Sequence, residues 1–326
     1  MKIVILGAGA LGRVLGAHLA RAGEDVTLIA RGKRAAYLQE HGATITGLAD
    51  FTVPVNVITD PSQVHSADVL IVTVKTYDMA SALAGVKHLD VGSILSIQNG
   101  VLKDEQLAAI FGWGKVLGAM AAFSAEVLPT GTVRFTTNQG FYLGEVPEGV
   151  SDRVQTLATT LERAGIVAKV TPSIQSVAWS KYVILVSGMA LAVLTRLETY
   201  RFLQAPQTAS VMASILHEMA HIATTQGIAL EDIGFFQAKT LSQLSLADTV
   251  AHLRHQGEQR ALQAPTHKVS TLQDLEQGKR LEVEETLGYA VRQSAALGIP
   301  TPTMDICYKL IAGPITISSD WSCVHY

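Results

Sequence analysis

The stretch KIVILGAGALG, residues 2–12, decides the fold of this chain. Its first half is a run of β-branched and other apolar residues that leads into Gly7, as expected of a strand buried on both faces. Gly7, Gly9 and Gly12 give the spacing GxGxxG, and a helical pattern of apolar residues follows over residues 10–22. A strand, a glycine turn and a helix in this order predict a Rossmann dinucleotide-binding unit.

Each glycine has its own role in such a turn. Gly7 permits the tight turn, Gly9 lets the backbone approach a pyrophosphate, and Gly12 lets helix and strand pack closely. Ala10 and Leu11 open the helix, whose N-terminal N–H groups attract phosphate. We therefore expect these five residues to bind the cofactor. The alternative is a tight turn that has no ligand.

The N-terminal half continues as strands alternating with helical segments. Apolar runs at residues 25–30, 68–74 and 92–97 have helix-length segments between them. This alternation predicts a doubly wound, mostly parallel sheet. The segments 133–137 and 140–144 flank Asn138-Gln139 and predict a hairpin with an antiparallel edge.

Strand patterns nearly vanish after Pro172, and an all-α C-terminal domain is expected. Helices are predicted over residues 207–226, 242–256 and 283–297. We expect a Rossmann domain at residues 1–171 and a helical substrate and catalytic domain at residues 172–326. A ligand cleft is expected at the junction of two such domains.

The end of the second predicted strand indicates which cofactor binds. Folds that prefer NAD usually carry Asp or Glu there to hold the ribose 2′-hydroxyl. This chain instead has Arg31, followed by Lys33 and Arg34. A guanidinium binds a 2′-phosphate in bidentate fashion, so NADP is predicted, with Arg31 as its main ligand. The alternative is a solvated basic start of a helix.

Two further strand ends are predicted to lie at the same edge of the sheet. Lys75 follows the strand at residues 68–74, and Asn99 follows the one at residues 92–97. Ligands of open α/β sheets bind beyond the carboxyl ends of the strands, so both side chains are candidates for contact with cofactor or substrate. The alternatives are a solvated loop lysine and a turn residue.

Composition excludes several classes of partner. The 326 residues include 48% hydrophobic and 16% charged residues with a net charge of −3, which argues against a nucleic-acid surface. Two cysteines, Cys307 and Cys323, are too few for a disulfide framework and favour the cytoplasm. The longest apolar run, residues 182–194, is shorter than the ~20 residues that cross a bilayer and predicts a buried helix without a membrane role.

Lys181 is the candidate general acid. It opens the most apolar helical segment, and loss of solvation there would lower its pKa towards the range useful for proton donation. The alternative is a lysine that reaches solvent at a helix end. The segment HEMAH, residues 217–221, matches the zinc motif HExxH, but a helical surface pair is the favoured interpretation and no metal is predicted.

The chain resembles the ketopantoate reductase (2-dehydropantoate 2-reductase) family over essentially its whole length. The matching pieces are GAGALG at 7–12, Arg31, TVK at 73–75, QNG at 98–100, WSK at 179–181 and STLQDLEQGKRLEVE at 270–284. The family reduces the ketone of ketopantoate with NADPH to give pantoate, a precursor of pantothenate.

The resemblance implies roles for single residues. Lys181 matches the catalytic lysine and Glu282 the glutamate beside it, while Ser270 matches the serine that binds the substrate carboxylate. Asn99 matches a residue at the nicotinamide and substrate. Arg31 and Lys75 match cofactor contacts.

The chain departs from the family pattern after Lys181. Members that act on ketopantoate typically carry substrate-binding asparagines where this chain has Leu185 and Met189. Ser187, Thr195 or Thr199 are the candidates to compensate, and Thr199 is taken as a substrate contact.

Three functions stay open: a ketopantoate reductase, a reductase of a more apolar 2-oxo acid, and a non-catalytic NADP(H) sensor. The apolar helical half is compatible with a homodimer.

Overall fold

The computed structural model describes residues 1–313, which fold as parts of two compact units. The first unit comprises Met1–Tyr182 with Leu230–Phe236, and the second comprises Val183–Ala229 with the chain from Gln237 onward. The division falls inside helix α6 (Ile174–Thr195), whereas the predicted domain boundary was at residues 171/172. Cys323 lies outside the described residues.

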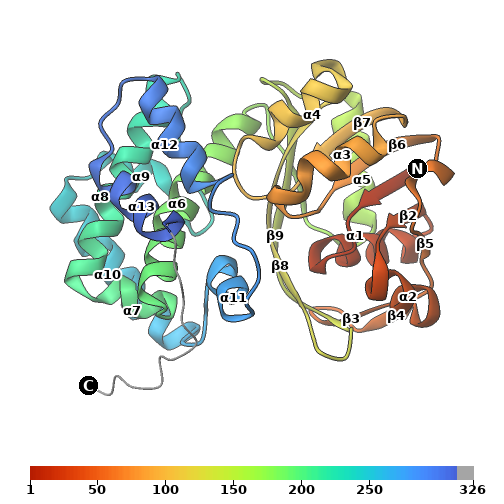
Figure 1. Ribbon diagram of the computed structural model, residues 1–326, viewed down its shortest axis with the longest axis horizontal. Coiled ribbons are helices and arrows are strands. Elements are labelled where there is room, and N and C mark those ends of the chain that lie inside the picture. Colours follow the sequence, from red (N-terminus) through yellow and green to blue (C-terminus); the bar gives the residue numbers. More distant parts are fainter. Residues whose placement is uncertain (314–326) are drawn as a thin grey trace. The chain divides into compact units, whose positions relative to one another are not determined.

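A five-stranded parallel sheet forms the centre of the first unit (Figure 1). All four of its strand pairs are parallel. The order across the sheet is β5 (Asn56–Ile58), β2 (Asp25–Ile29), β1 (Lys2–Leu6), β6 (Ser66–Val72) and β7 (Asp90–Ser96). The predicted doubly wound Rossmann sheet is therefore confirmed.

Strand β1 is buried on both faces because its alternate side chains enter two different cores. Ile3 and Ile5 pack in a hydrophobic cluster that includes side chains of α1 (Ala10–Arg21). Val4 and Leu6 pack in a second cluster with α3 (Met79–Val86) and α4 (Lys103–Phe111). This explains why the strand is a continuous apolar run rather than an alternating one.

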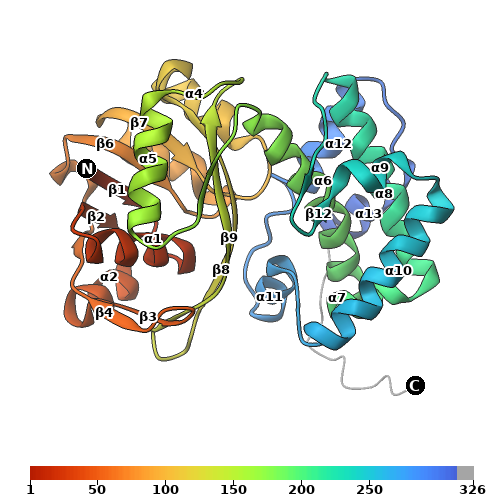
Figure 2. The same cartoon turned by 180° about the vertical axis from the view of Figure 1, so that it is seen from behind.

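A second, mixed sheet packs against the other side of α1 (Figure 2). Its strands are β3 (Ala43–Gly47), β4 (Phe51–Val53), β8 (Leu117–Val127), β9 (Val133–Glu145) and β10 (Ala168–Val170). The remaining elements of this unit are α2 (Gly32–His41), α5 (Asp152–Arg163) and the 3₁₀ turns η1 (Pro61–Gln63), η2 (Thr76–Asp78) and η3 (Trp113–Lys115).

The hairpin predicted at Asn138-Gln139 is wrong, because both residues lie inside β9. The antiparallel partners are β8 and β9, and their turn is at residues 128–131, where the N–H of Leu128 donates to the carbonyl of Thr132. Asn138 pairs with Phe123 just beyond a β-bulge, so the polar pair marks an irregularity of the ladder rather than a reversal of the chain.

The second unit is helical, as predicted. The short strand β11 (Asp232–Ile233) belongs to the first unit, and its partner β12 (Phe236–Gln237) lies where the chain passes back into the second. Its helices after α6 are α7 (Thr199–Gln204), α8 (Pro206–Thr225), α9 (Ala238–Gln243), α10 (Leu246–Gln263), α11 (Ser270–Glu276), α12 (Leu287–Ala296) and α13 (Pro302–Ala312).

Two of the helices predicted there differ from those observed. The segment 242–256 is divided because the Ser245 hydroxyl accepts from the N–H of Asp248 and caps α10. The segment 283–297 becomes helical only from Leu287.

Helix α6 is, within residues 1–313, the one helix that is long and apolar enough to span a membrane. It has 22 residues, and 72% of its most apolar window is buried inside the protein. Core helices pass the same test of length and composition, so α6 is weak support for a membrane span.

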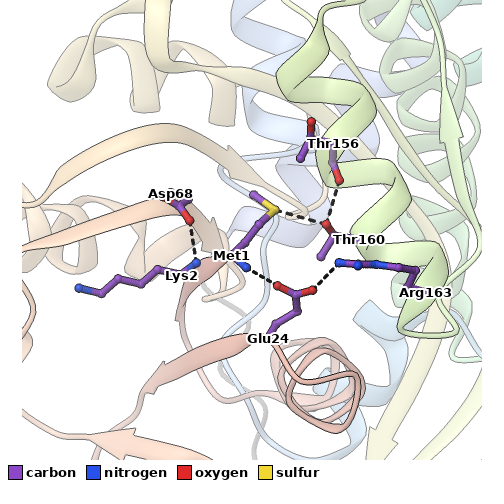
Figure 3. A network of polar contacts seen from close by, with 7 residues as sticks. All are labelled: Met1, Lys2, Glu24, Asp68, Thr156, Thr160 and Arg163. Atoms are coloured by element: carbon purple, nitrogen blue, oxygen red, sulfur yellow. Dashed lines mark hydrogen bonds and ion pairs between the residues drawn. The ribbon is translucent and has the colours of Figure 1, made fainter.

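The chain start is fixed by a polar network (Figure 3). The Met1 ammonium group and Arg163 of α5 both donate to the carboxylate of Glu24, which precedes β2. The hydroxyl of Thr160, also on α5, donates to the sulfur of Met1 at 3.4 Å. The network joins β1, the α1–β2 connection and α5.

Candidate active site

The carboxyl ends of four parallel strands lie at one edge of the central sheet. Leu6, the last residue of β1, pairs with Ile29 on β2 and with Val72 on β6, and Val72 pairs with Ser96 on β7. The candidate residues Gly7, Arg31, Lys75 and Asn99 lie within three residues of the ends of these strands. The fold therefore places them at the edge where α/β sheets bind ligands.

The three glycines of the first turn meet three different surroundings. Gly7 has φ +112°, and a Cβ there would lie 2.9 Å from the backbone nitrogen of Val74. A Cβ on Gly12 would lie 2.1 Å from the carbonyl oxygen of Gly7. A Cβ on Gly9 would have nothing within 4 Å, so open space borders this residue. Two glycines make the turn possible, and the third leaves room beside the backbone.

The start of α1 fits a negatively charged group. Gly9 is the N-cap residue, so no side chain caps the start of the helix. The first turn, which the structure describes in full, carries no acidic residue. The N–H groups of such a turn lack partners within the helix and carry the positive end of its dipole. Together with the open space at Gly9, this arrangement suits the pyrophosphate of a dinucleotide.

Gln98 is a residue that sequence reasoning did not select. It is 9% exposed, and its Nε2 donates to the carbonyl of Val74 at 2.8 Å, which ties the loop after β7 to the loop after β6. Its Oε1 is buried without a hydrogen bond among the described residues. Gln98 thus links the residues that directly precede Lys75 and Asn99.

A basic cavity of about 600 Å³ is bordered by Arg13 of α1, by the start of α2 and by residues 127–131. Its wall includes four cations, Arg13, Arg31, Lys33 and Arg34, and none of its described lining residues is acidic. Tyr37, the last residue of β8 (Val127) and the turn at residues 128–131 complete the wall. Three of these cations, Arg31, Lys33 and Arg34, were candidates from the sequence. Arg13 was not, because its only sequence signal is its place directly after the glycine motif.

Lys181 is held by an irregularity of the second sheet. Its Nζ donates to the carbonyl oxygen of Ala121 on β8 at 2.9 Å. The pairing of β8 with β9 shifts register between Ala121 and Phe123, and such bulges redirect the backbone next to functional sites. The preceding Ser180 accepts a hydrogen bond from the N–H of Glu231 at 2.8 Å. The short segment 230–236 therefore lies beside the candidate general acid.

In the second unit, Thr286 connects Glu282 with the position that departs from the family pattern. The Thr286 hydroxyl donates to the carbonyl oxygen of Glu282 and lies 3.5 Å from the sulfur of Met189. Glu282 is 5% exposed and Met189 is 1% exposed. The substitution of Met for the family's asparagine is thus in contact with the turn that carries the candidate glutamate.

The three hydroxyls proposed to compensate all have partners inside the protein. Ser187 is fully buried and donates to carbonyls of its own helix, and Thr195 donates to the carbonyl of Leu191. Thr199 is hydrogen-bonded to His267 Nδ1 at 2.9 Å. Ser270, by contrast, is exposed at the first position of α11.

The HEMAH segment has a structural role. The carboxylate of Glu218 accepts from the backbone N–H groups of Thr303 and Met304 and so caps the start of α13. His217 Nε2 is hydrogen-bonded to the hydroxyl of Thr249 at 3.0 Å. Across residues 1–313, no cluster of three or more His, Cys, Asp or Glu side chains has the arrangement of a metal site.

Two family models match this chain, and together they cover nearly its whole length. Residues 3–148 match the model of ketopantoate reductase PanE/ApbA, and residues 173–314 match the model of its C-terminal part. The chain belongs to the ketopantoate reductase family. It is therefore an oxidoreductase, of a family that depends on pyridine nucleotides.

Individual relatives agree with this family. The 2-dehydropantoate 2-reductase of Archaeoglobus fulgidus is 28% identical over 312 residues, which cover 96% of this chain and 97% of the relative. The crystal structure of a PanE/ApbA family ketopantoate reductase from Ralstonia eutropha superposes with a TM-score of 0.82 at 28% identity, covering 96% and 97% of the two chains. D-mandelate dehydrogenase, solved with NADH and anilino(oxo)acetate, has a TM-score of 0.80 at 20% identity over 96% and 97% of the chains and shares the fold.

Proposed function

We propose that this protein reduces a 2-oxo acid to a 2-hydroxy acid with NADPH, and that its substrate is ketopantoate. The observation that carries the proposal is the ammonium group of Lys181, fixed by the Ala121 carbonyl at the β8 bulge, in a unit whose glycine turn suits a dinucleotide. The full-length similarity to 2-dehydropantoate 2-reductases supports the same reaction.

The preference for NADP over NAD is supported by the basic cavity. Four cations line it and none of its described lining residues is acidic, which favours a nucleotide with an additional phosphate on its adenosine ribose. In this proposal Arg31 is the main ligand of that phosphate. The other cofactor contacts are Gly7, Gly9, Ala10, Leu11, Gly12, Lys75 and Asn99.

In the proposed reaction, reduced nicotinamide supplies a hydride to the carbonyl carbon of the substrate. Lys181 donates a proton to the carbonyl oxygen, so the C=O bond becomes a C–H and an O–H. An ammonium has three N–H donors, and the bond to Ala121 uses one of them to orient the group. Glu282 is assigned the role of the second catalytic residue, and Asn99, Ser270 and Thr199 are assigned to substrate binding.

A more apolar 2-oxo acid is the second candidate substrate. Met189 is buried where ketopantoate-specific members typically have an asparagine, and Leu185 replaces another. Burying polar substrate groups without partners costs about 1–3 kcal/mol each. D-mandelate dehydrogenase, which has this fold, has been solved with anilino(oxo)acetate, an oxo acid that carries an aromatic ring.

The test is NADPH oxidation by the purified protein with ketopantoate and with aliphatic and aromatic 2-oxo acids. Lys181→Ala should lower kcat about 100- to 10,000-fold, because general acid catalysis contributes that much. The matched control is Lys169→Ala, which removes an exposed lysine of β10 that contacts Tyr142 and should leave kcat unchanged.

Each outcome selects one function. Ketopantoate turnover that Lys181→Ala abolishes supports the proposal, whereas better turnover of an apolar 2-oxo acid transfers it to the second candidate. NADPH binding without turnover of any 2-oxo acid would leave a non-catalytic sensor. In this proposal the protein is a cytoplasmic enzyme of pantothenate biosynthesis. It is also proposed to be a homodimer, which light scattering tests.

A further inference from the structure

One buried side chain joins the glycine turn to the turn between β8 and β9. Arg13 is 4% exposed; its Nε donates to the carbonyl of Ala8 at 3.0 Å and its Nη1 donates to the carbonyl of Gly131 at 2.8 Å. Its second amine, Nη2, makes no hydrogen bond to any residue in the described part of the chain. Gly131 and Arg13 itself both line the basic cavity.

The same turn packs against an aromatic ring that is itself fixed. Gly131 has φ +87°, and a Cβ at this position would lie 2.4 Å from the ring of Tyr37. The Tyr37 ring stacks on His41, with 4.6 Å between the ring centroids. The guanidinium carbon of Arg13 lies 5.8 Å from the Tyr37 centroid. Arg13 and Tyr37 thus both contact the turn at Gly131.

The charged side chains in the described lining of the cavity are all positive. Burial lowers the pKa of Arg13, and the nearby charge of Arg34 lowers it further. Arg31 and Lys33 add two exposed cations to the same wall. Since none of the described lining residues is acidic, an anionic group in this cavity would meet four cations and no repelling carboxylate.

We propose that residues 127–131 form the outer wall of the pocket for the phosphate-bearing adenosine ribose, and that Arg13 is the positioning residue that holds this wall in place. The inference rests on the proposed NADP cofactor. It adds a specificity determinant contributed by the second sheet, at a distance of 118 residues along the chain from Arg13.

The experiment measures binding of two probes by calorimetry, without any 2-oxo acid. Adenosine 2′,5′-bisphosphate carries the additional phosphate and adenosine 5′-monophosphate lacks it. Arg13→Gln should lower the preference for the bisphosphate by about tenfold, because charge-assisted contacts to that phosphate lose their geometry. Arg21→Gln is the matched control, since Arg21 lies on the same helix but packs over Phe51, and its preference should equal that of the wild type.

Two further variants separate positioning from charge. Arg13→Lys keeps the charge but lacks the planar fork that reaches two carbonyls, so it should fail to restore the preference. Gly131→Ala moves the turn away from Tyr37 while Arg13 remains, and it should lower the preference as Arg13→Gln does. It also tests the inference if Arg13→Gln does not fold.

The outcomes are distinct. A wild-type protein with no preference for the bisphosphate overturns both the NADP proposal and this inference. A wild-type preference that persists in folded Arg13→Gln or Gly131→Ala, or that Arg13→Lys restores, overturns this inference alone. Loss of 2-oxo acid reduction does not affect the binding result.

Discussion

Glu24 shows how one buried carboxylate can join three elements. Its side chain is 7% exposed and accepts from the Met1 ammonium group and from Arg163 on α5 (Figure 3). Arg163 itself is 64% exposed. The two cations therefore differ in how strongly solvent screens their contact with Glu24.

Glu24→Gln should destabilise the first unit by about 1–3 kcal/mol, because it removes the charge that both cations face. Arg163→Gln is the control and should cost less than about 1 kcal/mol, since exposed ion pairs contribute little. Thermal unfolding of both variants checks the difference. If both variants lost the same amount of stability, this would contradict a stabilising role of the contact between Met1 and Glu24.

The glycine turn between β1 and α1 makes opposite demands at two of its positions. Gly9 has extended backbone angles and open space around it, whereas a Cβ on Gly12 would lie 2.1 Å from the carbonyl oxygen of Gly7 and 2.5 Å from the hydroxyl oxygen of Thr73. Alanine is therefore compatible with the fold at Gly9 and incompatible with it at Gly12.

Gly12→Ala should destabilise the protein by about 1–3 kcal/mol, as overpacking does. Gly9→Ala should change stability by less than about 0.5 kcal/mol but weaken NADPH binding, because its methyl group enters the space proposed for the pyrophosphate. Calorimetric titration and thermal unfolding measure the two effects. Unchanged NADPH affinity in Gly9→Ala would contradict the proposed site.

The turn between β8 and β9 is an element that the sequence pattern predicts poorly. The turn between β8 and β9 contains Pro129 and Gly131, which are ordinary turn residues, yet Asn138-Gln139 gave the stronger apparent signal. That pair lies at a bulge, where strand pairing is interrupted locally. A bulge depends on which strand lies opposite, so local sequence does not distinguish it from a turn.

At the scale of the whole first unit, His18 is a buried group that responds to pH. It lies on α1 between the rings of Phe51 and Phe135, and Nδ1 donates to the carbonyl of Ala164 at 2.7 Å. Its Nε2 is buried and has no hydrogen-bond partner among the described residues. Burial lowers the pKa of His18 from its usual value of 6.5, and the charge of Arg21 acts in the same direction.

Because the folded-state pKa of His18 lies below that of the unfolded chain, the unfolded chain takes up the proton first as the pH falls. The contribution of neutral His18 to stability is full above about pH 6.5 and is lost as the pH falls towards the folded-state pKa. His267, in the second unit, has its pKa lowered by burial and by Arg260 and adds to the same trend.

His18→Gln should reduce the dependence of the thermal midpoint on pH between about pH 7.5 and about pH 5.5, since glutamine can donate to Ala164 but does not titrate in this range. His255→Gln, which replaces a histidine that is 65% exposed, should leave the dependence unchanged. Scanning calorimetry at several pH values checks both. The same dependence in His18→Gln and wild type would contradict this role.

The sequence by itself determined the βαβ order, the glycine turn, the helical second half and three of the four cations in the basic cavity. These features depend on neighbouring residues: the period of apolar positions, the backbone freedom of glycine and the position at which a strand ends. Residues 2–12 contain all of this information within a single stretch.

Only the tertiary structure decided which distant groups meet. Lys181 donates to the carbonyl oxygen of Ala121, which is 60 residues away in the sequence. The Thr286 hydroxyl contacts the sulfur of Met189, which is 97 residues away. Arg13 could be assigned to the cavity only once the turn at Gly131 was seen to reach it. Such contacts depend on how strands and helices pack, because a hydrogen bond requires only that its two atoms lie close together in space. They therefore leave no periodic pattern in the sequence.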